Sequence, residues 1–120
     1  FGEGEHKSRF YPSLIKAAML NKNFSMTNGN QLRDFLHINT ATKKIKNELN
    51  FKDMDKKKFI IKNIYSGNYF TLKNFAKYVW KEKKAKGKLI FNKKKRSNDL
   101  DRIIPHGSKY IKFNEINFKI

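Results

Sequence analysis

The sequence predicts an α+β domain, with helices in the N-terminal part and a small antiparallel sheet or β-hairpin at the C-terminal end. Before Gly87, apolar residues recur every three or four positions, which is the spacing of a helix buried on one face. After Gly87 they alternate, as Ile111 and Phe113 do, which is typical of strands. The 120 residues have the length of one domain, and 38% of them are hydrophobic, which is enough for a core. We therefore expect residues 1–120 to form a single domain, with residues 1–11 as an extended arm.

Several helices are expected from apolar spacing and from capping residues. Pro12 suits the first turn of a helix that runs to about residue 21. Thr71 suits the N-cap of a strong helix over residues 72–86, which Gly87 is placed to end. Residues 54–65 fit either a helix or a short strand, and we favour the helix.

The C-terminal part predicts strands separated by a basic loop. Residues 88–91, KLIF, form the first strand, and residues 92–99 form the loop. The alternation in residues 109–120 predicts either a hairpin that turns at Asn114 or one longer strand.

Residues 30–51, NQLRDFLHINTATKKIKNELNF, predict two helices joined by a tight turn. Asn30 suits the N-cap of the first helix, and Asn39 or Thr40 suits that of the second. The apolar spacing places one side of each helix against the core and leaves Lys and Asn facing outward. The inward residues are Leu32, Phe35 and Leu36 in the first helix and Ala41, Ile45 and Leu49 in the second.

The turn in this segment resembles the helix-turn-helix pattern of DNA-binding proteins. Leu36, Ile38 and Asn39 supply the Leu, the Ile and the cap of that pattern. His37 stands where the pattern has Gly, and Lys43 stands where it has an apolar anchor. With the C-terminal strands as a wing, the resemblance implies a winged-helix-like protein. The alternative is an ordinary helical hairpin with a solvated polar face.

The formal net charge of +18 points to a polyanionic partner. Nucleic acid is the usual one, because binding releases counterions from its phosphates. Arginine is scarce; the arginines are Arg9, Arg33, Arg96 and Arg102. Lysine contacts phosphate as a point charge, whereas arginine reads bases in a bidentate manner, so the composition favours backbone contacts.

The candidate nucleic-acid-binding residues lie in three basic segments. They are Thr42, Lys43, Lys44, Lys46 and Asn47 on the second helix of residues 30–51, Lys83, Lys84 and Lys86 near Gly87, and Lys93, Lys94, Lys95 and Arg96 in the basic loop. Asn47 is the candidate for a bidentate contact with adenine. Duplex DNA is the first hypothesis. The second is RNA, as bound by a ribosomal or organellar ribosomal component of a larger assembly, because the charge is spread over many segments.

Little in the sequence indicates catalysis. Residues 101–108, DRIIPHGS, resemble the DHIIP string of HNH nucleases, in which the His is a general base and a later His or Asn binds the metal. Arg102 takes the position of that base, and no His follows His106. A nuclease or a degenerate relative is thus a remote alternative, and we expect no enzyme activity, metal site or cofactor.

Two absences bound the setting. The chain has no Cys, which excludes disulfides, thiol catalysis and Cys-ligated metal sites. No apolar run approaches the roughly 20 residues of a membrane span, so we expect no membrane partner. The absence of Cys suits an intracellular location. Because the chain starts at Phe1 rather than Met, we expect a fragment or a processed product.

Overall fold

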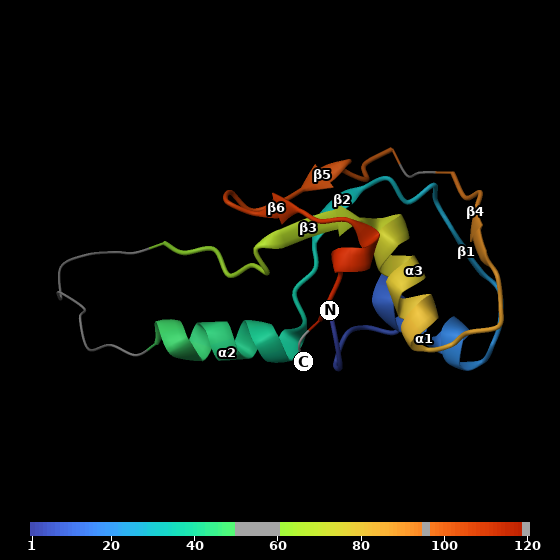
Figure 1. Cartoon of the computed structure of the whole chain (residues 1–120), viewed down its shortest axis with the longest axis horizontal. Coiled ribbons are helices and arrows are strands. Elements are labelled where there is room, and N and C mark those ends of the chain that lie inside the picture. Colours follow the sequence, from blue (N-terminus) through green and yellow to red (C-terminus); the bar gives the residue numbers. More distant parts are fainter. Residues whose placement is uncertain (50–60, 95–96, 119–120) are drawn as a thin grey trace.

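The computed structural model describes residues 1–49, 61–94 and 97–118, in which helices and strands are interleaved along the chain (Figure 1). The helices are α1 (Phe10–Met19), α2 (Ile38–Glu48) and α3 (Leu72–Glu82). The strands are β1 (Phe24–Met26), β2 (Leu32–Asp34), β3 (Asn68–Thr71), β4 (Leu89–Phe91), β5 (Arg102–Ile103) and β6 (Lys109–Tyr110). A 3-10 turn, η1 (Phe113–Glu115), follows β6. The predicted α+β class is confirmed.

The strands form two sheets, and neither is the predicted C-terminal sheet. In the smaller one, β1 and β4 are parallel, with Phe24 opposite Leu89. The larger one has the order β5-β2-β3-β6; β2 and β3 are antiparallel, and the two outer strands are parallel to their neighbours. The expected hairpin is therefore wrong, because β4, β5 and β6 each pair with an earlier strand. Alternation predicts a strand but not its partner, and β1, β2 and β3 offer backbone groups that need partners.

The predicted helix-turn-helix pair is also wrong among the described residues. Its supporting helix is replaced by β2, in which Arg33 lies opposite Phe70 of β3. The Leu32 N–H donates to the Asp101 carbonyl at 2.7 Å, and the Asp34 carboxylate accepts from the Ser66 N–H at 2.8 Å. These long-range bonds hold residues 32–34 extended, although the apolar spacing around them fits a helix.

The second helix of that pair is confirmed, but it starts earlier than expected. α2 begins at Ile38, and the Nδ1 atom of His37 accepts from the Asn39 N–H at 3.2 Å. His37 is buried at this helix start, so it caps α2 in place of Asn39 or Thr40.

The other two helices were predicted well. α1 matches the expected helix, and in α3 the Thr71 hydroxyl accepts from the Asn74 N–H at 3.1 Å. α3 ends at Glu82 rather than at Gly87, because Lys84 adopts a left-handed conformation with φ of 50°. Gly87 instead passes close to the turn after α1, where a Cβ would lie 2.2 Å from the Lys22 carbonyl oxygen.

Aromatic rings fill the core between the sheets and α3. Phe75 is fully buried, and the ring of Phe35 stacks on it with centroids 4.0 Å apart. The ring of Phe1 also meets Phe75 edge-on at 4.9 Å. Phe1 is tied to the start of α2 through backbone hydrogen bonds to Leu36 and Ile38, each 2.8 Å long. The beginning of the expected arm is therefore part of the core.

The helix predicted over residues 54–65 lies partly outside the described residues. Residues 54–60 are outside the described residues, and residues 61–65 have no regular secondary structure.

Candidate nucleic-acid interface

α2 carries the first group of predicted contact residues. Figure 1 shows this helix extending away from the body formed by α1, α3 and the sheets. All five predicted residues on it are exposed, namely Thr42, Lys43, Lys44, Lys46 and Asn47. The Thr42 hydroxyl donates to the Ile38 carbonyl of its own helix at 2.9 Å. The lysines and Asn47 are therefore accessible to a partner, as predicted for an outward face.

The opposite side of α2 does not meet the core as expected. No residue of α2 is buried, and Ile45 and Leu49 are 47% and 54% exposed. The prediction that Ala41, Ile45 and Leu49 face the core is wrong, because Ala41 is only partly buried and Ile45 and Leu49 remain about half exposed.

The second group forms a basic surface at the end of α3. Lys83, Lys84 and Lys86 are exposed, and this segment lies against the turn after α1. The Lys86 N–H donates to the Asn21 side chain at 2.8 Å, and the Lys88 N–H donates to the Asn23 side chain at 2.9 Å. These bonds bring two further exposed lysines, Lys22 and Lys88, beside the three predicted ones. We call these five residues the basic end: Lys22, Lys83, Lys84, Lys86 and Lys88.

The ends of two helices meet at the basic end. α1 ends at Met19 and α3 at Glu82, so the carbonyl groups of both C-terminal turns are nearby. Those carbonyls carry partial negative charge, which favours lysine there. Lys22 comes beside the end of α3 only through folding, because the two segments are far apart in the chain.

The third group is described only in part. Lys93 and Lys94 follow β4 and are exposed, and the Lys93 N–H donates to the Met26 carbonyl at 3.0 Å. This bond holds the start of the basic loop against β1. Lys95 and Arg96 lie outside the described residues.

Carboxylates in the described part of the chain neutralise few of these charges. The ion pairs between described residues are Arg9–Glu5 at 3.4 Å, Arg33–Asp99 at 3.1 Å and Lys62–Glu48. Within the described part of the chain, none of the predicted lysines takes part in an ion pair. The exposed lysines therefore remain available for anionic groups of another molecule.

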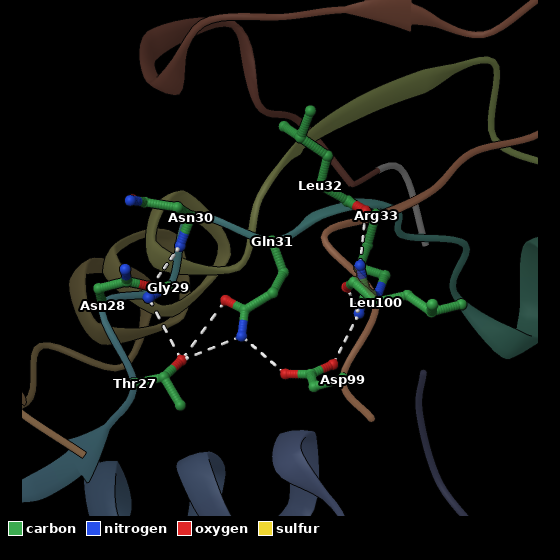
Figure 2. A network of polar contacts seen from close by, with 9 residues as sticks. All are labelled: Thr27, Asn28, Gly29, Asn30, Gln31, Leu32, Arg33, Asp99 and Leu100. Carbon is green, nitrogen blue, oxygen red and sulfur yellow. Dashed lines mark hydrogen bonds and ion pairs between the residues drawn. The ribbon is translucent and has the colours of Figure 1, made fainter. Parts of the chain in front are cut away.

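Arg33 has a structural role instead. Figure 2 shows its guanidinium donating to Asp99 Oδ1 at 3.1 Å and to the Leu100 carbonyl at 2.8 Å. The other carboxylate oxygen, Oδ2, accepts from Gln31 Nε2 at 2.7 Å, and that amide also donates to the Thr27 hydroxyl at 3.2 Å. Gln31 is only 2% exposed, so its amide depends on protein partners. The network fastens the end of the basic loop, at Asp99, to β2 and the residue before it. We call it the Asp99 clamp.

Neither a cluster of metal-ligating side chains nor a membrane-spanning helix is found among the described residues. No three His, Asp or Glu side chains in residues 1–49, 61–94 and 97–118 are grouped to hold a metal ion. In the string that resembles the HNH motif, the Arg102 guanidinium lies over the ring of Tyr69, 5.5 Å from its centroid. In the same ranges, no helix has the length and apolarity required to cross a bilayer.

Comparison with known proteins adds no family. No protein-family model matches the chain, and no curated protein is significantly similar to it.

Proposed function

We propose that the chain binds nucleic acid without catalysis, through lysine contacts with phosphates rather than by reading bases. One observation carries the proposal: the predicted lysines that the structure describes are exposed and have no ion-pair partner among the described residues. With a net charge of +18, binding to a polyphosphate would relieve the repulsion between these lysines and release counterions.

The arrangement of the lysines favours RNA over duplex DNA. Figure 1 shows α2 at one end of the molecule and β4, which Lys93 and Lys94 follow in the chain, at the other. A folded RNA can contact lysines at both ends, whereas a groove-reading protein presents one element to one groove. The replacement of the supporting helix by β2 removes the motif on which the duplex-DNA hypothesis rested. RNA inside the cell, including RNA within a larger assembly, is therefore the partner that we place first.

The proposal is tested by comparing ligands at one fixed salt concentration. We expect fluorescence anisotropy to show binding to an RNA hairpin, to single strands and to a DNA duplex, with the tightest binding to RNA. If inorganic phosphate or a mononucleotide binds as tightly as the polymers, the site is a single anion pocket and the proposal is wrong. Tightest binding to duplex DNA would restore the first hypothesis.

Variants of the basic end locate the contacts. Replacing Lys22, Lys83, Lys86 and Lys88 with Ala should weaken binding to all sequences about equally, because contacts with phosphate carry no base information. Exposed charges contribute little to folding, so thermal unfolding should be nearly unchanged. The matched control replaces two lysines near β6, Lys109 and Lys112, and should bind almost as the parent does.

A further inference from the structure

Within residues 1–49, 61–94 and 97–118, α2 is a helix with little tertiary packing. It has 11 residues, and none of them is buried. Isolated helices shorter than roughly 12–15 residues are marginal in water, and β-branched residues such as Thr40, Thr42 and Ile45 weaken them further. A helix of this kind is normally stabilised by tertiary contacts of its apolar side. Among the described residues, Ile38 packs against Gly2 at the start of α2, but no residue of the helix is buried.

The apolar side of α2 is continuous. Ile38, Ala41, Ile45 and Leu49 are spaced by three or four residues, so they share one face of the helix. Ile38, Ile45 and Leu49 are each about half exposed, at 46%, 47% and 54%. Single exposed apolar residues are common on proteins, whereas an exposed stripe along one helix marks an interaction surface.

A groove extends this surface toward α1. Its volume is about 810 Å³, and Ile38 lines it together with Ile15, Met19 and Leu20 of the α1 side. Met19 and Leu20 are also largely exposed. Ile38 belongs to both the stripe and the groove, so an apolar partner surface lying on α2 would also reach the end of α1.

The rim of the stripe is basic. Helical spacing places Lys46 on one flank of the stripe and Lys44 on the other. Glu48, which shares the flank of Lys44, is already paired with Lys62. Lys44 and Lys46 therefore attract carboxylates to the rim of α2. Glu3 and Glu5 line the groove and not this rim.

We infer that α2 is a docking site for an acidic amphipathic helix of another polypeptide. The apolar side of that helix covers the stripe, and its flanking Glu or Asp residues pair with Lys44 and Lys46. A second copy of the chain does not suit this surface, because each copy carries +18 and the two would repel. Nucleic acid does not suit this surface either, because charged phosphates gain nothing from contact with apolar side chains. The inference goes beyond the proposed phosphate contacts, although the two surfaces share Lys44 and Lys46.

The test uses designed peptides and the full chain, without nucleic acid. The probe is a labelled helical peptide with a Leu seam flanked by Glu. One control peptide has Lys in place of Glu, and the other has Ser in place of Leu. We expect anisotropy to show binding of the first peptide alone. Failure of the Glu-flanked peptide to bind, or equal binding of the Lys-flanked one, would overturn the inference.

Variants of α2 separate this surface from the phosphate contacts. Ile45→Ser with Leu49→Ser should weaken peptide binding about tenfold or more, and RNA binding should stay near that of the parent. The matched control is Asn47→Ser on the opposite side of α2, which should leave peptide binding unchanged. The reversal Lys44→Glu with Lys46→Glu should transfer preference to the Lys-flanked peptide. If it does not, the rim does not select the partner and the inference fails.

Two further measurements exclude other occupants. Sedimentation should show a monomer. If it shows a dimer, and the variant Ile45→Ser with Leu49→Ser is a monomer, the stripe is instead the contact with a second copy. Binding to vesicles of anionic lipid that the same variant abolishes would assign it to a membrane surface. Either result would contradict the docking of an acidic helix.

Discussion

Removal of the Asp99 carboxylate is the sharpest test of how the C-terminal segment is held. Asp99→Ala leaves the Nε2 group of the buried Gln31 without its 2.7 Å acceptor and removes the 3.1 Å pair with Arg33. A buried donor left unsatisfied costs about 1–3 kcal/mol. The ion pair adds only about 0–1 kcal/mol, because both side chains are partly exposed, at 21% and 33%. We therefore expect the free energy of unfolding to fall by about 1–4 kcal/mol.

Urea denaturation of the parent and of four variants, including the double variant Asp99→Ala with Gln31→Leu, measures this effect. Asp99→Asn keeps one acceptor oxygen, so its free energy of unfolding should fall less than that of Asp99→Ala. In a cycle with Gln31→Leu, the two positions should show a coupling of about 0.5–3 kcal/mol, since they share a hydrogen bond. A loss for Asp99→Ala within about 0.5 kcal/mol of zero would place it among ordinary surface changes and refute the clamp.

Two other predictions concern the core and the groove. Phe75→Ala should lower the free energy of unfolding by about 3–5 kcal/mol in chemical denaturation, because its ring is fully buried against Phe35. Ile45→Ala should change that free energy by no more than about 0.5 kcal/mol, because Ile45 is about half exposed. Equal losses for the two variants would show that α2 is covered by its own chain. Burial and the nearby carboxylates, chiefly that of Glu5, raise the pKa of Tyr11 above its usual 10.0. The stability that this shift contributes is fully present below pH 10.0 and is lost as the pH rises through the raised pKa. Ultraviolet titration should show a late tyrosine that Tyr11→Phe removes, and a titration unchanged by that variant would contradict the shift.

The helices whose determinants are local could be predicted from the sequence. The cap at Thr71 and the apolar spacing after it lie within a few residues, and the structure has α3 beginning there. The same reasoning found α1 and the body of α2. It placed the end of α3 too late, because the left-handed conformation of Lys84 is unusual for a residue other than Gly.

Long-range pairing could not be predicted. Leu32 and Phe35 fit a helical face, but β3 and Asp101 bind the backbone of residues 32–34 as a strand. The partners lie more than 30 positions away, and one sequence carries no record of such contacts. The predicted pairing of the C-terminal strands was wrong for the same reason, because alternation indicates a strand but does not identify its neighbour.

The candidate site was predicted in composition but not in arrangement. The exposed lysines of α2 and of the segment after α3 were identified from charge runs, and the structure leaves them at the surface. Lys22 joins the basic end only through the contact between the turn after α1 and the segment around Gly87. Arg33 lies in the Asp99 clamp, 66 positions from its partner, which no local pattern indicates.

The salt dependence of RNA affinity tests the central claim most directly. If lysines bind phosphates, the logarithm of the binding constant should fall linearly with the logarithm of the salt concentration, with a slope of about −0.7 per phosphate on single strands. The variant lacking Lys22, Lys83, Lys86 and Lys88 should have a slope shallower by about three. An affinity that is independent of salt, or a slope that is the same in this variant and the parent, would contradict the account.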